Sequence, residues 1–322
     1  MVQVRLLIVA LLFASCATTA TLDQSVDRII AAHPGKTIAV AYCEISPSPG
    51  ASRHPLPARG ARGNDGDGGP SPRLRGEGGR RPDEGCVLRN ENESFHAAST
   101  MKVPVMLGIF EAVTRGELRL DQPVRVKNDF VSIFDGSHYS LEAREDSDPE
   151  LYKEIGRELP LENLVRRMID KSSNLATNII IEFIGAPKVM ELMKQIGAFN
   201  IRVLRGVEDD KAYHAGMNNT TTAYDLMLIF KALGERRVIS PEASDRMIDI
   251  LLGQEHNDGI PAGLPRGTRV AHKTGWITGI SHDAGLVFRP DGTSYVLVIL
   301  TRGFAKEKEA QRVMARIARA TW

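Results

Sequence analysis

Apolar residues recur along this chain with a helical spacing in some stretches and a strand-like spacing in others. Residues 22–33 show the helical spacing, and 37–42 form a continuous β-rich run, so a helix followed by a strand is predicted. From 101 to about 252 the spacing is predominantly helical. The clearest amphipathic helices are expected at 161–169, 175–183 and 222–233.

Strand-like patterns return only near the end, at 272–274, 284–288 and 295–300, and an amphipathic helix pattern follows at 306–320. This order predicts an α+β fold, in which both ends of the chain share one antiparallel sheet flanked by terminal helices. We assign about 21–98 and 266–322 to the sheet lobe and about 99–265 to an all-helical lobe, within a single domain over 21–322. The cleft between such lobes is a natural place for an active site.

The predicted first hairpin is interrupted by a segment of different composition. Residues 47–84 are rich in Pro, Gly, Arg, Ser and Asp and contain almost no apolar side chains. Because such a segment cannot offset its ordering entropy by apolar burial, we predict a disordered insert. Cys43 and Cys86 lie on either side of it. A disulfide across the hairpin and two unpaired thiols on different faces are both compatible with the sequence, since bridging depends on strand register.

The first 20 residues have the pattern of an export signal. Arg5 is followed by an apolar run over 6–14 and by small residues up to Ala20. Cleavage after Ala20 would release an exported protein, periplasmic or secreted, and we favour this outcome. The alternative is a lipoprotein anchored at Cys16, because Ala14-Ser15-Cys16 resembles a lipoprotein cleavage site.

Charge and metal-ligand patterns exclude several function classes. The 322 residues contain 41 Lys and Arg against 40 Asp and Glu, so no global field favours nucleic acid or an anionic membrane surface. The three cysteines lack C-x-x-C spacing, and no H-E-x-x-H motif occurs among the eight histidines. We therefore expect no metal and no cofactor, and we take the protein to be a monomer that binds a small molecule.

Candidate chemistry first appears at the start of the long helical block. Ser99 and Lys102 are three residues apart, so on a helix their side chains would share one face. A serine hydroxyl needs a neighbour to accept its proton, and a lysine can do so only if burial or nearby positive charge lowers its pKa. Backbone N–H groups at the helix start would favour negative charge on a bound carbonyl oxygen. The pair is thus a candidate nucleophile and base.

Two further short motifs follow in order. Ser172-Ser173-Asn174 lies between two predicted helices, and Lys273-Thr274-Gly275 opens a predicted strand. The ordered set S-x-x-K, S-x-N and K-T-G is the pattern of class A β-lactamases and penicillin-binding proteins. From about residue 22 to 322, apart from the insert, the chain resembles the class A β-lactamase family within the penicillin-binding serine hydrolase superfamily. The resemblance implies a β-lactamase/transpeptidase-like fold with its active site between the lobes.

The resemblance also implies catalytic roles. Ser99 would be acylated, with Lys102 as base or proton relay, and Ser172 would pass a proton to the departing nitrogen. Asn174 would hold Lys102 and the substrate amide.

The K-T-G strand would bind the substrate on the same resemblance. Lys273 and Thr274 would hold its carboxylate, and Gly275 would leave room for its close approach. The backbone N–H groups of Ser99 and Trp276 would form the oxyanion hole.

The chain departs from the family pattern at two places in the site. Ser173 stands where the family's lactamases usually have Asp. Glu208 is the best candidate for the base that activates water for deacylation, but no Leu-Asn follows it at the family spacing. An ion pair with Arg205 is the alternative role for Glu208.

A third departure lies outside the motifs. The stretch 126–137 is longer than in typical class A enzymes. Phe130, Phe134 and Tyr139, in or just after it, are expected to pack in the core more readily than to contact substrate.

These observations leave three functions open. The leading hypothesis is a serine β-lactamase that hydrolyses β-lactam antibiotics through a Ser99 acyl-enzyme. The alternative is a D,D-peptidase or esterase-like enzyme that acts on peptidoglycan peptides and deacylates slowly. A non-catalytic sensor that retains the fold is the third.

Overall fold

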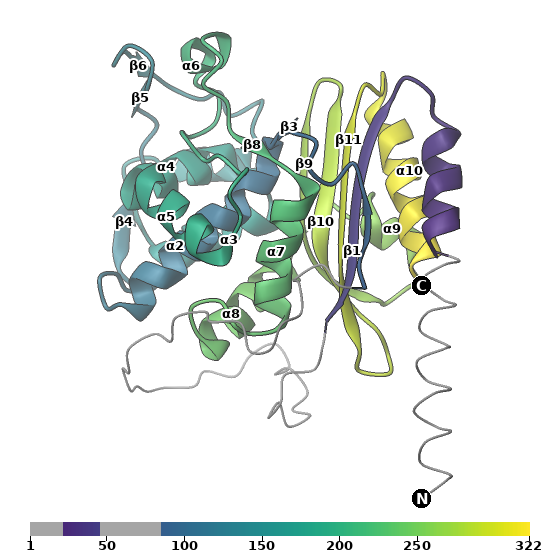
Figure 1. The fold of residues 1–322 in the computed structure, drawn as a ribbon. Coiled ribbons are helices and arrows are strands. Elements are labelled where there is room, and N and C mark those ends of the chain that lie inside the picture. Colours follow the sequence, from purple (N-terminus) through teal and green to yellow (C-terminus); the bar gives the residue numbers. More distant parts are fainter. Residues whose placement is uncertain (1–21, 46–84) are drawn as a thin grey trace, which may run out of the picture.

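The computed structural model describes residues 22–45 and 85–322. The predicted export signal, Cys16 and the insert at 47–84 lie outside these residues. In Figure 1 a sheet stands beside a group of helices, and the N-terminal helix (residues 22–31) and α10 (Glu307–Ala320) cover its opposite face. Within the described residues, no helix has both the length and the apolar character needed to cross a membrane.

Within the described residues, five strands form one antiparallel sheet in the order β2-β1-β11-β10-β9. They are β1 (Thr37–Ile45), β2 (Val87–Arg89), β9 (Arg269–Ile277), β10 (Ile280–Phe288) and β11 (Ser294–Arg302). β1 pairs with β11 along its whole length, with Thr37 opposite Arg302 and Ile45 opposite Ser294. Both ends of the chain therefore share the sheet, and the predicted α+β class is confirmed.

Alternate residues of β1 face two separate cores. Ile38 and Val40 belong to the core under the terminal helices, whereas Ala39 and Ala41 belong to the core shared with the helical lobe. This alternation is the period-two pattern of a strand covered on both faces. It explains why the sequence of β1 reads as one continuous apolar run.

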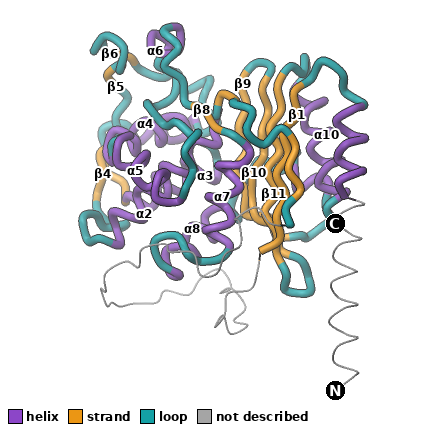
Figure 2. The backbone as a smooth tube through the Cα atoms, viewed as in Figure 1, coloured by secondary structure: helices purple, strands orange, loops and turns teal. Residues whose placement is uncertain are grey.

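The helical lobe is built around α2 (Lys102–Thr114), whose first nine residues are all buried. The other helices of this lobe are α3 (Leu161–Asp170), α4 (Asn174–Ile184), α5 (Ala186–Ile196), α6 (Asp210–His214), α7 (Ala223–Gly234) and α8 (Pro241–Leu251). The predicted helices at 161–169, 175–183 and 222–233 correspond to α3, α4 and α7. Figure 2 shows how much of the chain between them is loop.

Several short elements connect the larger ones. They are the 3-10 turns η1 (Ala98–Met101) and η2 (Pro149–Glu154), the short helix α9 (Ile260–Gly263), and the strand pairs β3 (Phe95–His96) with β8 (Thr220–Thr221), β4 (Pro123–Arg125) with β7 (Glu158–Pro160), and β5 (Phe130–Val131) with β6 (His138–Tyr139). These two- to six-residue elements carry too little periodicity to be recognised in a sequence.

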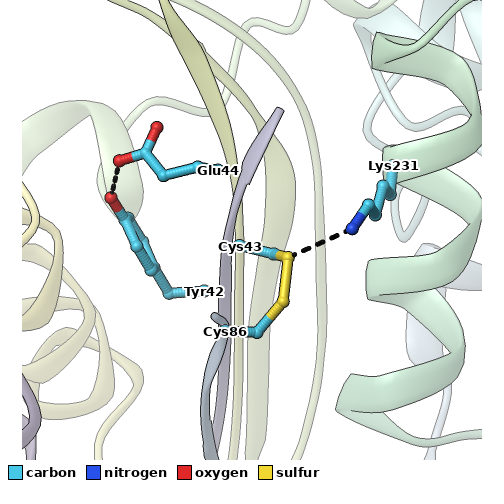
Figure 3. The surroundings of a disulfide bond; sticks show 5 residues. All are labelled: Tyr42, Cys43, Glu44, Cys86 and Lys231. Carbon is cyan, nitrogen blue, oxygen red and sulfur yellow. Dashed lines mark hydrogen bonds between the residues drawn. A yellow bond between two sulfur atoms is a disulfide. The ribbon is translucent and has the colours of Figure 1, made fainter. Parts of the chain in front are cut away.

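A disulfide joins Cys43 to Cys86 where β1 and β2 meet (Figure 3). The two Cα atoms are 4.4 Å apart, and the cysteines are separated by 43 residues. In the chain-entropy description, closing a loop of this length stabilises the fold by about 4 kcal/mol. On the helical side the Lys231 ammonium donates a hydrogen bond to Cys43 Sγ at 3.5 Å. The open question about these thiols is thus resolved in favour of the bridge.

Candidate active site

Ser99 lies in η1, directly before α2, rather than in the first turn of the α-helix as the sequence predicted. Strand β9 passes very close to this turn. A Cβ added to Gly275 would lie 2.7 Å from the Ser99 backbone nitrogen and 3.0 Å from that of Thr100. No side chain fits in that space, so glycine is what lets the K-T-G strand reach the Ser99 backbone.

Lys102 is fully buried and points at the S-x-N loop. Its ammonium donates hydrogen bonds to Ser172 O at 2.7 Å, Ser172 Oγ at 3.2 Å and Asn174 Oδ1 at 2.8 Å. Burial lowers the pKa of Lys102 to about 7, although the charges of Asp146 and Glu208 act in the opposite direction. A substantial fraction of Lys102 is therefore neutral near physiological pH, as a general base must be.

Ser173 has a structural role at the start of α4. Its hydroxyl caps α4 by accepting a hydrogen bond from Ala176 N at 3.2 Å. The same hydroxyl donates to Asp146 Oδ2 at 3.4 Å, and that carboxylate also accepts from Leu175 N at 2.8 Å. Because Asp146 already places a negative charge at this helix start, a second carboxylate at 173 would be repelled.

Glu208 reaches the same cluster from a loop of the helical lobe. Its Oε1 accepts a hydrogen bond from Asn174 Nδ2 at 2.6 Å. The single amide of Asn174 thus connects Lys102 and Glu208, one through its oxygen and the other through its nitrogen. Burial raises the pKa of the Glu208 carboxyl above its ordinary value, with the Asn174 hydrogen bond opposing that shift.

The predicted alternative for Glu208, an ion pair with Arg205, is wrong. The Arg205 guanidinium instead donates to Met217 O at 2.9 Å, Gly206 O at 2.9 Å and Asn218 Oδ1 at 3.3 Å. Arg205 therefore closes the base of the loop and leaves the Glu208 carboxylate directed at Asn174.

Two residues of the K-T-G strand hold buried polar groups. Lys273 is fully buried, and its ammonium donates to Thr274 O at 3.0 Å. Burial and the charge of Lys102 hold the pKa of Lys273 well below its ordinary value. Among the described residues, Thr274 Oγ1 is a buried oxygen without a hydrogen-bond partner. Such an orphaned hydroxyl fits a position that a ligand oxygen fills.

His256, which the sequence did not suggest, lies next to Trp276 near the end of β9. The Trp276 side chain is 37% exposed, and its ring lies edge-on to the His256 ring with centroids 5.1 Å apart. His256 Nε2 is also 3.3 Å from Lys171 O, next to the S-x-N triplet. A cavity of about 90 Å³ lies beside His256, Thr274 and Trp276 and extends towards α10.

The structure brings the candidate residues of the three motifs and Glu208 into one region. The backbone of Gly275 lies close to the backbone of Ser99. Lys102 forms hydrogen bonds with Ser172 and Asn174, and Asn174 in turn forms one with Glu208. Sequence reasoning missed Asp146 and His256. Each is a single polar residue outside any motif, so the sequence offered no signal for either.

The three aromatic residues Phe130, Phe134 and Tyr139 differ in their surroundings. Phe130 is buried and belongs to the main core, as expected. The expectation of core packing is wrong for Phe134, which is 56% exposed. Tyr139 is half-buried, packs against the main core and places its hydroxyl 3.5 Å from Val207 O.

The α+β fold and the hydrogen bonds of Lys102 with Ser172 and Asn174 are compatible with a serine hydrolase. A sequence profile described as the β-lactamase enzyme family matches residues 81–322. The chain belongs to this family.

Individual relatives agree with that assignment. The chain is 28% identical over 227 residues to a β-lactamase of Bacillus amyloliquefaciens, which covers 69% of each sequence. It is 23% identical over 256 residues to the β-lactamase VEB-1 of Pseudomonas aeruginosa, covering 72% of this chain and 79% of that one.

Solved structures show the same fold. PBP-A superimposes with a TM-score of 0.69 at 23% identity, over 93% of this chain and 94% of that one. The extended-spectrum β-lactamase TLA-1 gives a TM-score of 0.70 at 18% identity, over 94% and 98%.

Proposed function

We propose that this protein is a serine β-lactamase of the class A type, which hydrolyses β-lactams through an acyl-enzyme on Ser99. The observation that carries the proposal is the polar connection from buried Lys102 through Asn174 to Glu208. Through Asn174, it connects Lys102, the candidate base for acylation, to Glu208, the candidate base for deacylation. The relatives named as β-lactamases support the same substrate class.

The acylation step uses the buried side of the cluster. Neutral Lys102 accepts the proton of the Ser99 hydroxyl while the serine oxygen bonds to the lactam carbonyl carbon. The carbon–nitrogen bond then breaks. The Ser172 hydroxyl, whose Oγ lies 3.2 Å from the Lys102 nitrogen, donates its proton to the departing nitrogen and receives from Lys102 the proton that came from Ser99. The backbone N–H groups of Ser99 and Trp276 stabilise the oxyanion, and Lys273 and Thr274 bind the substrate carboxylate.

The deacylation step uses Glu208. The ionised carboxylate accepts a proton from a water molecule while the water oxygen attacks the acyl carbonyl carbon. The bond from that carbon to the Ser99 oxygen then breaks, and the Ser99 oxygen takes back the proton held by Glu208. The Asn174 hydrogen bond supports this role, because it directs Glu208 towards the residue that also orients Lys102.

The lifetime of a penicillin adduct tests the proposal. We expect the wild type to turn over a chromogenic cephalosporin, and the Glu208→Gln variant to acylate at a similar rate but deacylate about a hundredfold to ten-thousandfold more slowly. Intact-mass spectrometry of quenched samples would measure the adduct, with Ser99→Ala as the unlabelled control. An adduct on Ser99 that is equally long-lived in both proteins would contradict the proposal.

That contradictory result would favour a penicillin-binding D,D-peptidase or esterase. The specific observation behind this second candidate is Glu208 itself, which lacks the Leu-Asn that follows the deacylating Glu in the family pattern. Release of D-alanine from a model peptide would then identify the peptidase. Absence of both turnover and any adduct, in the wild type and in Glu208→Gln, would leave only a non-catalytic binding protein.

We also propose that the protein is exported. The export-like first 20 residues and the Cys43–Cys86 disulfide support an oxidising compartment. Cell fractionation would test this, and a membrane-bound form that becomes soluble in Cys16→Ala would identify the lipoprotein alternative.

A further inference from the structure

We propose that the β5–β6 hairpin (residues 130–139) is a clamp that holds Glu208 in place, with Asp209 and Ser132 as positioning residues. The inference rests on the proposed role of Glu208 in deacylation.

Glu208 needs external support because of its backbone. Its φ angle is +59°, in the left-handed region that non-glycine residues rarely adopt. Such a conformation persists only where the surrounding contacts over-determine it. The Asn174 hydrogen bond fixes the carboxylate end of Glu208, but it does not fix the backbone.

The residue after Glu208 is fixed by the tip of the hairpin. Asp209 is 2% exposed. One of its oxygens accepts from Ser132 Oγ at 2.8 Å, and the other accepts from Ile133 N at 3.0 Å. The first oxygen also caps α6 by accepting from Ala212 N at 3.1 Å. Hydrogen bonds to a buried carboxylate are among the stronger ones in proteins.

The residue before Glu208 is fixed by the base of the same hairpin and by α4. Asn178 Oδ1 accepts from Val207 N at 2.6 Å, and Asn178 Nδ2 donates to Val207 O at 3.0 Å. The Tyr139 hydroxyl accepts from Asn178 Nδ2 at 3.3 Å and lies 3.5 Å from Val207 O. The hairpin therefore contacts the chain on both sides of Glu208, with Ser132 at one end and Tyr139 at the other.

The apolar side chains near the hairpin tip are only partly buried. Val131, Ile133 and Phe134 are 51%, 42% and 56% exposed. Figure 2 shows β5, β6 and α6 projecting together from the helical lobe. At the rim, Lys211 of α6 forms an exposed ion pair with Asp135 at 2.7 Å and donates to Ser137 Oγ at 2.8 Å. This rim contact joins the same two segments without flanking Glu208, so it provides a matched control.

The test compares Ser132→Ala and Asp209→Asn with Lys211→Met. We expect the two clamp variants to lose about tenfold to a hundredfold in the deacylation rate constant, with acylation changed less than about threefold, because a small displacement of a catalytic group costs this much. Lys211→Met should leave both rate constants unchanged. In a Glu208→Gln background, Ser132→Ala should have no further effect on deacylation.

Hydrogen–deuterium exchange provides a readout that does not depend on activity. Peptides covering 205–209 should exchange about tenfold faster in both clamp variants and at the wild-type rate in Lys211→Met. Ser132→Ala keeps the test available if Asp209→Asn does not fold.

The outcomes separate the two proposals. Unchanged exchange at 205–209, or faster exchange without slower deacylation, would overturn the clamp. If Glu208→Gln deacylates normally, the proposed function fails, and the clamp fails with it as a positioning device. If Glu208→Gln is slow while Ser132→Ala and Asp209→Asn are not, the clamp alone fails.

Discussion

The two halves of the candidate site are built in different ways. Lys102 is buried at the start of the central helix α2, among buried neighbours on that helix, and its partner Ser172 is buried on the loop between α3 and α4. Glu208 is half-buried on a loop and is held by side-chain hydrogen bonds to neighbouring segments. Lys102 and Ser172, which are assigned to acylation, are thus buried. Glu208, which is assigned to deacylation, is half-buried on a loop and is held by hydrogen bonds.

A buried base and a loop carboxylate differ in how much change in their surroundings they tolerate. Packed interiors tolerate little displacement, so a base within the core keeps its geometry at no extra cost. A loop carboxylate can be lost, moved or strengthened without disturbing the core. A fold of this kind can therefore serve an enzyme that keeps its acyl intermediate or one that hydrolyses it, depending on the loop.

The largest expected effect comes from replacing the buried base. Lys102→Met fills a similar volume but removes the proton acceptor, and we expect acylation to fall by at least about a thousandfold. Loss of the ammonium donor also leaves buried acceptors unpaired, which costs about 1–3 kcal/mol of stability. Stopped-flow acylation and thermal melting measure the two effects, with Lys188→Met as the exposed control. Acylation within tenfold of wild type would show that the core does not supply the base.

A smaller effect is expected where the sheet meets Ser99. Gly275→Ala introduces a Cβ 2.7 Å from the Ser99 backbone nitrogen, so strand or turn must shift, and we expect acylation to fall about a hundredfold. Deacylation of any adduct that forms should also slow, because the displaced Ser99 N–H would stabilise the oxyanion in both steps. Thr278→Ala, in the same hairpin of the sheet, is the control. Acylation within tenfold of wild type would show that the close approach of β9 to Ser99 is not required.

Part of this site was predictable from sequence because short motifs record contacts between distant residues. The contact from Lys102 to Ser172 joins residues 70 positions apart, and apolar periodicity could not have predicted that contact. The ordered motifs predicted it, because each motif occupies a fixed place in the fold. The α+β class followed from the order of helical and strand-like patterns, which depends on strong apolar periodicity in β1, β10, β11 and the long helices.

The contacts that were not predictable depend on loop geometry. Asp146 binds Leu175 N across 29 positions, and Asp209 binds Ser132 across 77 positions. Acidic residues in polar stretches usually indicate solvated loops, so neither was distinguishable from its neighbours. The disulfide was left open for the same reason, because it required the register that pairs Tyr42 with Val87.

The smallest expected effect, and the one that compares the two halves most directly, is the dependence on pH. Lys102 must be neutral to act, and its pKa is lowered to about 7, so acylation should fall about tenfold per pH unit below 7. Glu208 must be ionised, and burial raises the pKa of its carboxyl from the ordinary value, so deacylation should also weaken on acidification. Quenched-flow mass spectrometry between pH 5 and 8 measures both rates separately. An acylation rate that does not fall below pH 7 would contradict the role of Lys102 as the base.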